Sequence, residues 1–210
     1  MAHAPALATF ETDAWWNSIV QTIWQRASHD VKDALNGVSV NIEVIRSRAT
    51  RADLPAAALA PFGEAAGTQA EKLATLLDAL LGLARAEREP PDVALIVRRL
   101  AVAVSASSSP SDRKIVVDTS GVAGPTTVQV KGEVVRIALA GLLLGAVTSY
   151  SSLGGGPFDC GIFTDGDVVR VRLSNIGTAT RPAPQEEFFQ QHGIAIVRDG
   201  DTINMNFPRL

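Results

Sequence analysis

An apolar repeat near the start of the chain is the feature that most constrains the fold. From Trp24 to Ile45 apolar residues recur every three or four positions, in six steps that span 21 residues and average 3.5. This period is typical of a helix that packs along a bundle or coiled-coil seam, and it excludes a strand. The seam consists of Trp24, Ala27, Val31, Leu35, Val38, Ile42 and Ile45. Apolar residues from Phe10 onward extend the same helix upstream, and residues 49–55 are expected to end it.

A second amphipathic helix is predicted over residues 70–88, where leucines again recur every three or four positions. Pro90 and Pro91 end it. Residues 50–68 are rich in proline, glycine and alanine and are expected to form a long connection, with room for a helical turn or two within it. Because two amphipathic helices cannot close a core, we expect a second copy to complete a dimeric four-helix bundle.

The second half of the chain alternates between helix and strand patterns. Helices are predicted over 92–105 and over the strongly apolar 132–150, which should be buried. Strands are predicted over 114–117, 127–130 and 202–207, with a hairpin of 158–163 and 168–173 around the turn 164–167. The fold class is therefore α+β, a helical hairpin over residues 1–89 followed by an α/β sandwich over residues 90–210.

Composition excludes several function classes. The 210 residues are 46% hydrophobic with a net charge of −3, which favours a packed core and disfavours sequence-blind nucleic-acid binding. One cysteine, Cys160, rules out a disulfide framework within the chain and a multi-cysteine zinc site. The longest apolar run, residues 137–147, is too short to cross a bilayer, and the first residues lack the basic start of an export signal. We expect a cytoplasmic protein with no membrane partner.

His29 is the residue most suggestive of chemistry. It lies two residues from each of the seam residues Ala27 and Val31, so it should point away from the seam toward solvent. Asp33 and Asn36 follow on the same helical face. On the periodicity alone, a solvated surface histidine and a functional histidine both remain open.

The wider sequence resembles a known family. Residues 28–37, Ser-His-Asp-Val-Lys-Asp-Ala-Leu-Asn-Gly, followed by Leu-Leu-Asp-Ala-Leu-Leu-Gly-Leu-Ala-Arg at 76–85, resemble the dimerisation and phosphoacceptor hairpin of two-component histidine kinases. In that family the phosphorylated histidine is followed, in fixed order, by an acidic residue, a hydrophobe, a basic residue, a polar residue and a leucine. The matching positions are His29, Asp30, Val31, Lys32, Asp33 and Leu35, with Ala34 where the family usually has proline.

The second half resembles the ATP-binding domain of the same kinases, with the nucleotide-binding positions altered. The magnesium-binding asparagine is replaced by Gly145, and the adenine-binding aspartate by Asn175, with Ala179 at a motif glycine. The glycine-rich phosphate loop is reduced to residues 192–196, and the stretch 180–191 is short for an ATP lid. Magnesium needs hard oxygen ligands, and phosphates need close backbone approach. We therefore expect no nucleotide and no cofactor in this chain.

The combination resembles the dimeric histidine phosphotransferases of phosphorelays. The resemblance implies a homodimer in which His29 accepts a phosphoryl group from a response-regulator receiver domain, without autokinase activity. The receiver would supply Mg²⁺, and a hybrid histidine kinase is a further implied partner. We expect Asp30 to accept a hydrogen bond from the second ring nitrogen of His29. The remaining residues of the docking surface would be Arg26, Lys32, Asp33 and Asn36.

Three other interpretations stay open. A divergent histidine kinase would autophosphorylate from ATP. A non-catalytic module would bind a receiver or kinase without phosphoryl transfer. A helical dimer of unrelated purpose would do neither.

Overall fold

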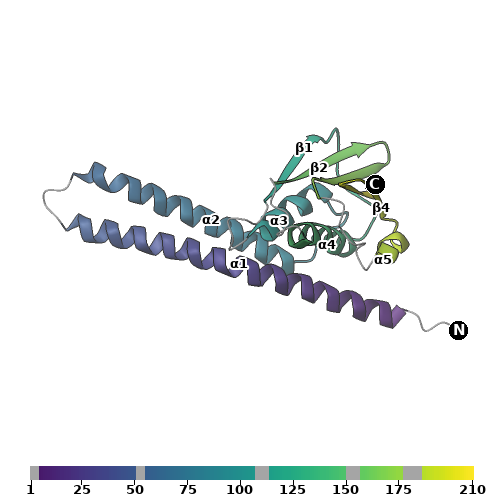
Figure 1. The fold of residues 1–210 in the computed structure, drawn as a ribbon, viewed down its shortest axis with the longest axis horizontal. Helices are drawn as coiled ribbons and strands as arrows, with labels where there is room; N and C mark the ends of the chain where they lie inside the picture. The colour runs from purple at the N-terminus through teal and green to yellow at the C-terminus, as the bar shows by residue number, and fades with distance from the viewer. Residues whose placement is uncertain (1–4, 51–54, 107–113, 150–156, 177–185) are drawn as a thin grey trace.

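The computed structural model describes all residues except 1–4, 51–54, 107–113, 150–156 and 177–185. Two long helices form a hairpin that extends from a layer of shorter helices and a sheet (Figure 1). The described residues thus form the α+β fold that the sequence predicts.

The hairpin consists of α1 (Pro5–Ala49) and α2 (Ala60–Ala84), joined through the short 3₁₀ helix η1 (Ala56–Leu59). The heptad pattern correctly predicts α1 and its end. The prediction of a long connection over 50–68 is wrong, because α2 begins ten residues earlier than expected. Pro61 lies in the first turn of α2, where its missing N–H has no intrahelical acceptor to lose, so proline there starts the helix.

The face of α1 that packs within the chain overlaps the predicted seam only in part. Ala27 and Ala34 are fully buried, and a Cβ on Gly37 would lie 3.0 Å from Gln69 Cγ of α2. This row of small residues lets the two helices approach closely. The larger seam residues remain open to solvent, with exposures of 42% for Trp24, 53% for Leu35 and 53% for Ile42.

The second half is a mixed layer of helices on one face of a sheet. The two helices are α3 (Val93–Ser105) and α4 (Gly132–Ser149). The strands are β1 (Ile115–Gly121), β2 (Phe158–Asp165), β3 (Val168–Ser174), β4 (Ala195–Asp199) and β5 (Thr202–Pro208), in the order β1-β2-β3-β5-β4. β1 is parallel to β2, and the other pairs are antiparallel. Along β3 and β5 every second residue is buried beneath the helices, as the alternating sequence predicts.

Several predicted boundaries in this layer are confirmed and two features were missed. The hairpin turn forms at Gly166, whose φ of +56° is in the left-handed region that glycine tolerates best. Residues 127–130, predicted as a strand, make only isolated bridges from Thr127 and Val128. The sequence patterns did not predict β4 or the short α5 (Glu186–Gln191).

One hydrophobic core runs from the hairpin into the sheet. Ile19 and Ile23 of α1 are buried in the same cluster as α3, α4 and the inner face of the sheet. Trp15 lies against Gly141 of α4, where a Cβ would come within 2.6 Å of the indole. Its ring centroid is 5.7 Å from that of Phe189 in α5. The first part of α1 is therefore a third layer beneath α4 (Figure 1).

A buried arginine fastens the end of α2 to this interface. The Arg136 guanidinium donates hydrogen bonds to the carbonyl of Leu83, at 3.3 Å, and to that of Arg85. It also lies 4.6 Å from the ring centroid of Trp16. Arg136 thereby connects α4 with the end of α2 and the beginning of α1.

None of the described helices combines the length and the apolar character needed to cross a bilayer.

Candidate functional site

His29 projects from the middle of α1 with its side chain 57% exposed. Its Nδ1 lies 2.9 Å from Asp33 Oδ2, one helical turn further along. An ionised carboxylate can only accept a hydrogen bond, so Nδ1 carries the proton. In a neutral imidazole with its proton on Nδ1, the lone pair is on Nε2, which is the state a nucleophilic histidine requires.

Asp30 does not have the role expected from the sequence. Its side chain is only 15% exposed and is directed toward α2, where Lys72 Nζ lies 3.9 Å from Oδ2. Consecutive helical residues are about 100° apart around the axis, so Asp30 faces the neighbouring helix while Asp33 stays beside His29. The residue that orients the imidazole is therefore Asp33, and Asp30 instead contributes to the contact between the hairpin helices.

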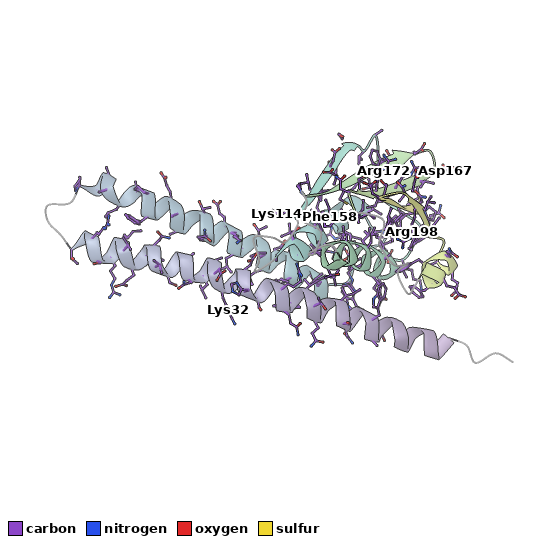
Figure 2. All side chains as sticks on the ribbon, viewed as in Figure 1. Lys32, Lys114, Phe158, Asp167, Arg172 and Arg198 are labelled. Carbon is purple, nitrogen blue, oxygen red and sulfur yellow. The ribbon has the colours of Figure 1, made fainter. Side chains whose placement is uncertain are left out.

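The other predicted docking residues lie on the same stretch of α1. Lys32 and Asn36 are exposed, and Arg26 is half-buried. Figure 2 shows Lys32 on the side of α1 that faces away from α2. Ligand atoms of His29, Asp30 and Asp33 lie within 4.8 Å of one another. Such a cluster on an exposed helix is not by itself a metal site, and its members are explained by the contacts above.

A groove beside Asp30 was not predicted from the sequence. It has a volume of about 320 Å³ and lies where α1, α2 and α3 meet. Its lining residues include Lys72, Val102 and Lys114 along with Asp30. No sequence signal identifies them as a group, because tertiary packing alone brings these three helices and the start of β1 together.

Among the described residues, the positions expected to bind a nucleotide and magnesium do not carry the ligands that these groups need. Gly145 offers no side-chain ligand, and from residue 134 to 149 α4 contains no aspartate, glutamate, asparagine or glutamine. The Asn175 amide donates to Asp159 Oδ2 at 2.8 Å. The Asn175 side chain therefore connects the end of β3 to β2. Ala195 and Ile196, interpreted as part of a reduced phosphate loop, begin strand β4. Ala179 lies outside the described residues.

Two other chemically notable residues have structural explanations. Cys160 is fully buried in β2, and burial raises the pKa of its thiol to about 12. His192 places Nδ1 2.8 Å from the Phe188 carbonyl, just beyond α5.

Comparison with known proteins finds similarity among solved structures and none among sequences. No protein-family model matches the sequence, and no curated protein sequence matches it. Among solved structures, the chain is similar to the Acinetobacter baumannii histidine kinase AdeS, with 12% sequence identity, a TM-score of 0.37, and coverage of 86% of this chain and 97% of that chain. A TM-score below 0.5 does not establish a common fold, so the function has to be argued from the chain's own residues.

Proposed function

We propose that this protein is a histidine phosphotransferase that relays a phosphoryl group between response-regulator receiver domains through a phosphohistidine on His29. The observation that carries the proposal is the exposed imidazole, whose Nδ1 is held 2.9 Å from Asp33 while Nε2 is left to react. A histidine that serves only packing would be buried, and one that serves only solubility would not need a fixed tautomer.

In the proposed reaction Nε2 attacks the phosphorus of an aspartyl phosphate on the receiver. The Nε2–P bond forms as the P–O bond to the aspartate breaks, and the aspartate leaves as a carboxylate. Positive charge develops on the imidazole, whose Nδ1 proton stays hydrogen-bonded to Asp33. The negative charge of Asp33 stabilises this state. The reverse reaction passes the group to a second receiver.

The phosphoryl donor in this proposal is another protein. The residues of α4 and Asn175 do not provide a magnesium or adenine site, so no ATP step is assigned to this chain. The receiver would bring Mg²⁺ with its own acidic site, and a hybrid histidine kinase would deliver the phosphoryl group to the relay. Arg26, Lys32 and Asn36 surround His29 and would contact the visiting domain.

The exposed seam supports a homodimer. Trp24, Leu35 and Ile42 form an apolar row that no described residue of the same chain covers. A second hairpin packed on this row would complete a four-helix bundle and leave His29 on the outside. Residues 1–89 would then form the dimerisation and phosphoacceptor unit, with residues 90–210 as a kinase-like sandwich, in a cytoplasmic protein.

Phosphoryl transfer can be tested with matched histidine variants. Purified receiver domains carrying a ³²P-labelled aspartyl phosphate are mixed with the parent protein, with His29→Gln, and with His192→Gln as a control at another exposed histidine. We expect label on the parent and on His192→Gln only. Equal labelling of His29→Gln would reject the proposal.

Two additional assays separate the alternatives. Incorporation of label from ATP and Mg²⁺ would identify a divergent kinase. Receiver binding that survives His29→Gln, without any label transfer to the parent protein, would identify a non-catalytic interaction module.

Dimerisation is tested independently by sedimentation. Leu35→Glu and Ile42→Glu place charges on the seam and should convert the dimer to a monomer. Val40→Glu is a matched control because Val40 is also 53% exposed but lies off the seam. A monomeric parent protein would contradict the four-helix bundle.

A further inference from the structure

A second groove lies away from His29, between α3 and the edge strand β1. It has a volume of about 340 Å³. Its walls are mainly apolar, formed by Ala101 and Val102 of α3 and by Ile115 and Val117 of β1. Ser105 and two cations, Arg98 and Lys114, complete the lining. The groove therefore combines an apolar interior with positive charge.

The strand beside this groove has backbone groups left to pair. β1 is at the end of the sheet and pairs only with β2 among the described strands. In a parallel pair only alternate residues direct their N–H and C=O groups to the neighbouring strand. Because Phe158 N donates to the Lys114 carbonyl, Lys114 and Val116 face β2, whereas Ile115 and Val117 face the open edge.

Two hydrogen bonds made by side chains join α3 to β1. The groove lies between these two bonds. The Ile115 N–H donates to Ser105 Oγ at 3.1 Å, and Arg98 donates to Thr119 Oγ1 at 3.0 Å. Helix α3 thus follows β1 in the opposite direction, joined to it at both ends. Between these two bonds, the N–H and C=O of Val117 point toward the groove.

We propose that this groove binds an extended acidic peptide segment of a partner protein, which adds to the sheet as a strand beside β1. Main-chain bonds to Val117 would hold the peptide, and its alternate apolar side chains would enter the groove against Val102. The acidic residues would lie near Lys114. Figure 2 shows Lys114 where the mixed layer meets the hairpin.

The charged side chains around the groove favour a peptide with negative charge. Lys114 and Arg98 line it. The adjoining groove shares Val102 and Lys114 with this one, and its other cation, Lys72, is paired with Asp30. The nearby carboxylate of Asp118 accepts from Ser120 N at 2.8 Å and from the Ser120 hydroxyl, and these bonds lower the pKa of Asp118. Asp118 is the fourth of the seven residues of β1 and is engaged with Ser120, so the acidic residues of the peptide belong at the Lys114 end.

The test uses a fluorescein-labelled hexapeptide of alternating valine and glutamate, measured by fluorescence anisotropy with the full chain. We expect saturable binding that weakens about tenfold with Lys114→Glu, with Val102→Asp, or when one central peptide amide is N-methylated. A peptide with lysine in place of glutamate should bind the parent protein more weakly and bind Lys114→Glu more tightly. Val197→Asp is the matched control, because Val197 is 50% exposed on β4 at the opposite edge of the sheet.

Several results would overturn the proposal. No saturable binding would do so, as would binding that ignores both N-methylation and Lys114→Glu. Equal loss with Val197→Asp would indicate a general affinity for sheet edges. A change of sedimentation coefficient with Lys114→Glu alone would instead assign the groove to a second copy. Because Lys114 is exposed, this variant tests the site even where Val102→Asp fails to fold, and no step depends on phosphorylation of His29.

Discussion

Replacement of Arg136 by methionine tests whether the interface between the hairpin and the mixed layer is held by one buried cation. The variant keeps the apolar stem but removes the hydrogen bonds to Leu83 and Arg85 and the contact with Trp16. A hydrogen bond from a charged donor contributes about 1.5–3 kcal/mol, and a desolvated cation–π contact about 1–2 kcal/mol.

Burial opposes these gains. Desolvation lowers the pKa of Arg136, and its Nε has no hydrogen-bond partner among the described residues. The variant avoids this penalty but leaves two carbonyls with a lost partner. We therefore expect Arg136→Met to lower the free energy of unfolding by about 3 kcal/mol.

The matched control is Arg172→Met on the outer face of the sheet. Arg172 also lies over an aromatic ring, 4.9 Å from the centroid of Phe163, and its Nε donates to Asn204 Oδ1 at 3.1 Å. Because this guanidinium is partly exposed (Figure 2), its removal should cost about 1 kcal/mol or less. Urea denaturation followed by tryptophan fluorescence measures both values. Losses equal within about 0.5 kcal/mol would refute a special role for the buried site.

Three other predictions address the site and the core. Asp33→Asn removes the charged acceptor of the His29 ring proton, so the rate of label transfer from a phosphorylated receiver should fall about fivefold, and an unchanged rate would remove Asp33 from the mechanism. Gly141→Val forces Trp15 away from α4 and should lower the free energy of unfolding by about 1–3 kcal/mol in urea titration, whereas Gly145→Val, which meets no atom within 4 Å, should have a smaller effect. A thiol pKa near 12 means that Cys160 stays protonated below that pH, so iodoacetamide at pH 8 should modify it in urea but not in the native protein, and rapid native labelling would contradict its burial.

The helices were predictable where a sustained period was present. The seam from Trp24 to Ile45 predicts α1 because 22 residues of one pattern outweigh any local preference. The start of α2 was missed because its first ten residues carry Pro61, Gly63 and Gly67, which favour a loop in isolation. In the folded chain the packing of α2 on α1 outweighs that preference.

One contact of His29 differs from the sequence prediction, and the role of the site stays a prediction. Adjacency in sequence suggested Asp30 as the partner of His29, but the helix turns Asp30 toward Lys72 and leaves Asp33 beside the ring. Residues four positions apart lie side by side on a helix, and this rule identifies Asp33 as the neighbour of His29. Strand β4 could not be predicted in this way, because it is five residues long and its pairing with β5 depends on tertiary contacts.

In the proposed phosphoryl transfer, the position of His29 around α1 limits the direction from which a donor can approach. His29 is two residues beyond Ala27 and six beyond Ile23, which places it about 200° and 240° around the helix from these fully buried residues. The mixed layer and α2 cover the buried side, so the imidazole points in nearly the opposite direction. To turn His29 toward the mixed layer, α1 would have to expose Ile23 and Ala27 and separate Trp15 from α4. Burial of one large apolar side chain contributes about 1.5–3 kcal/mol. Exposing these side chains would therefore remove much of the free energy of unfolding of a typical domain. A donor that approaches from solvent meets Nε2 without any rearrangement, which favours transfer from a separate protein over transfer from the mixed layer of the same chain.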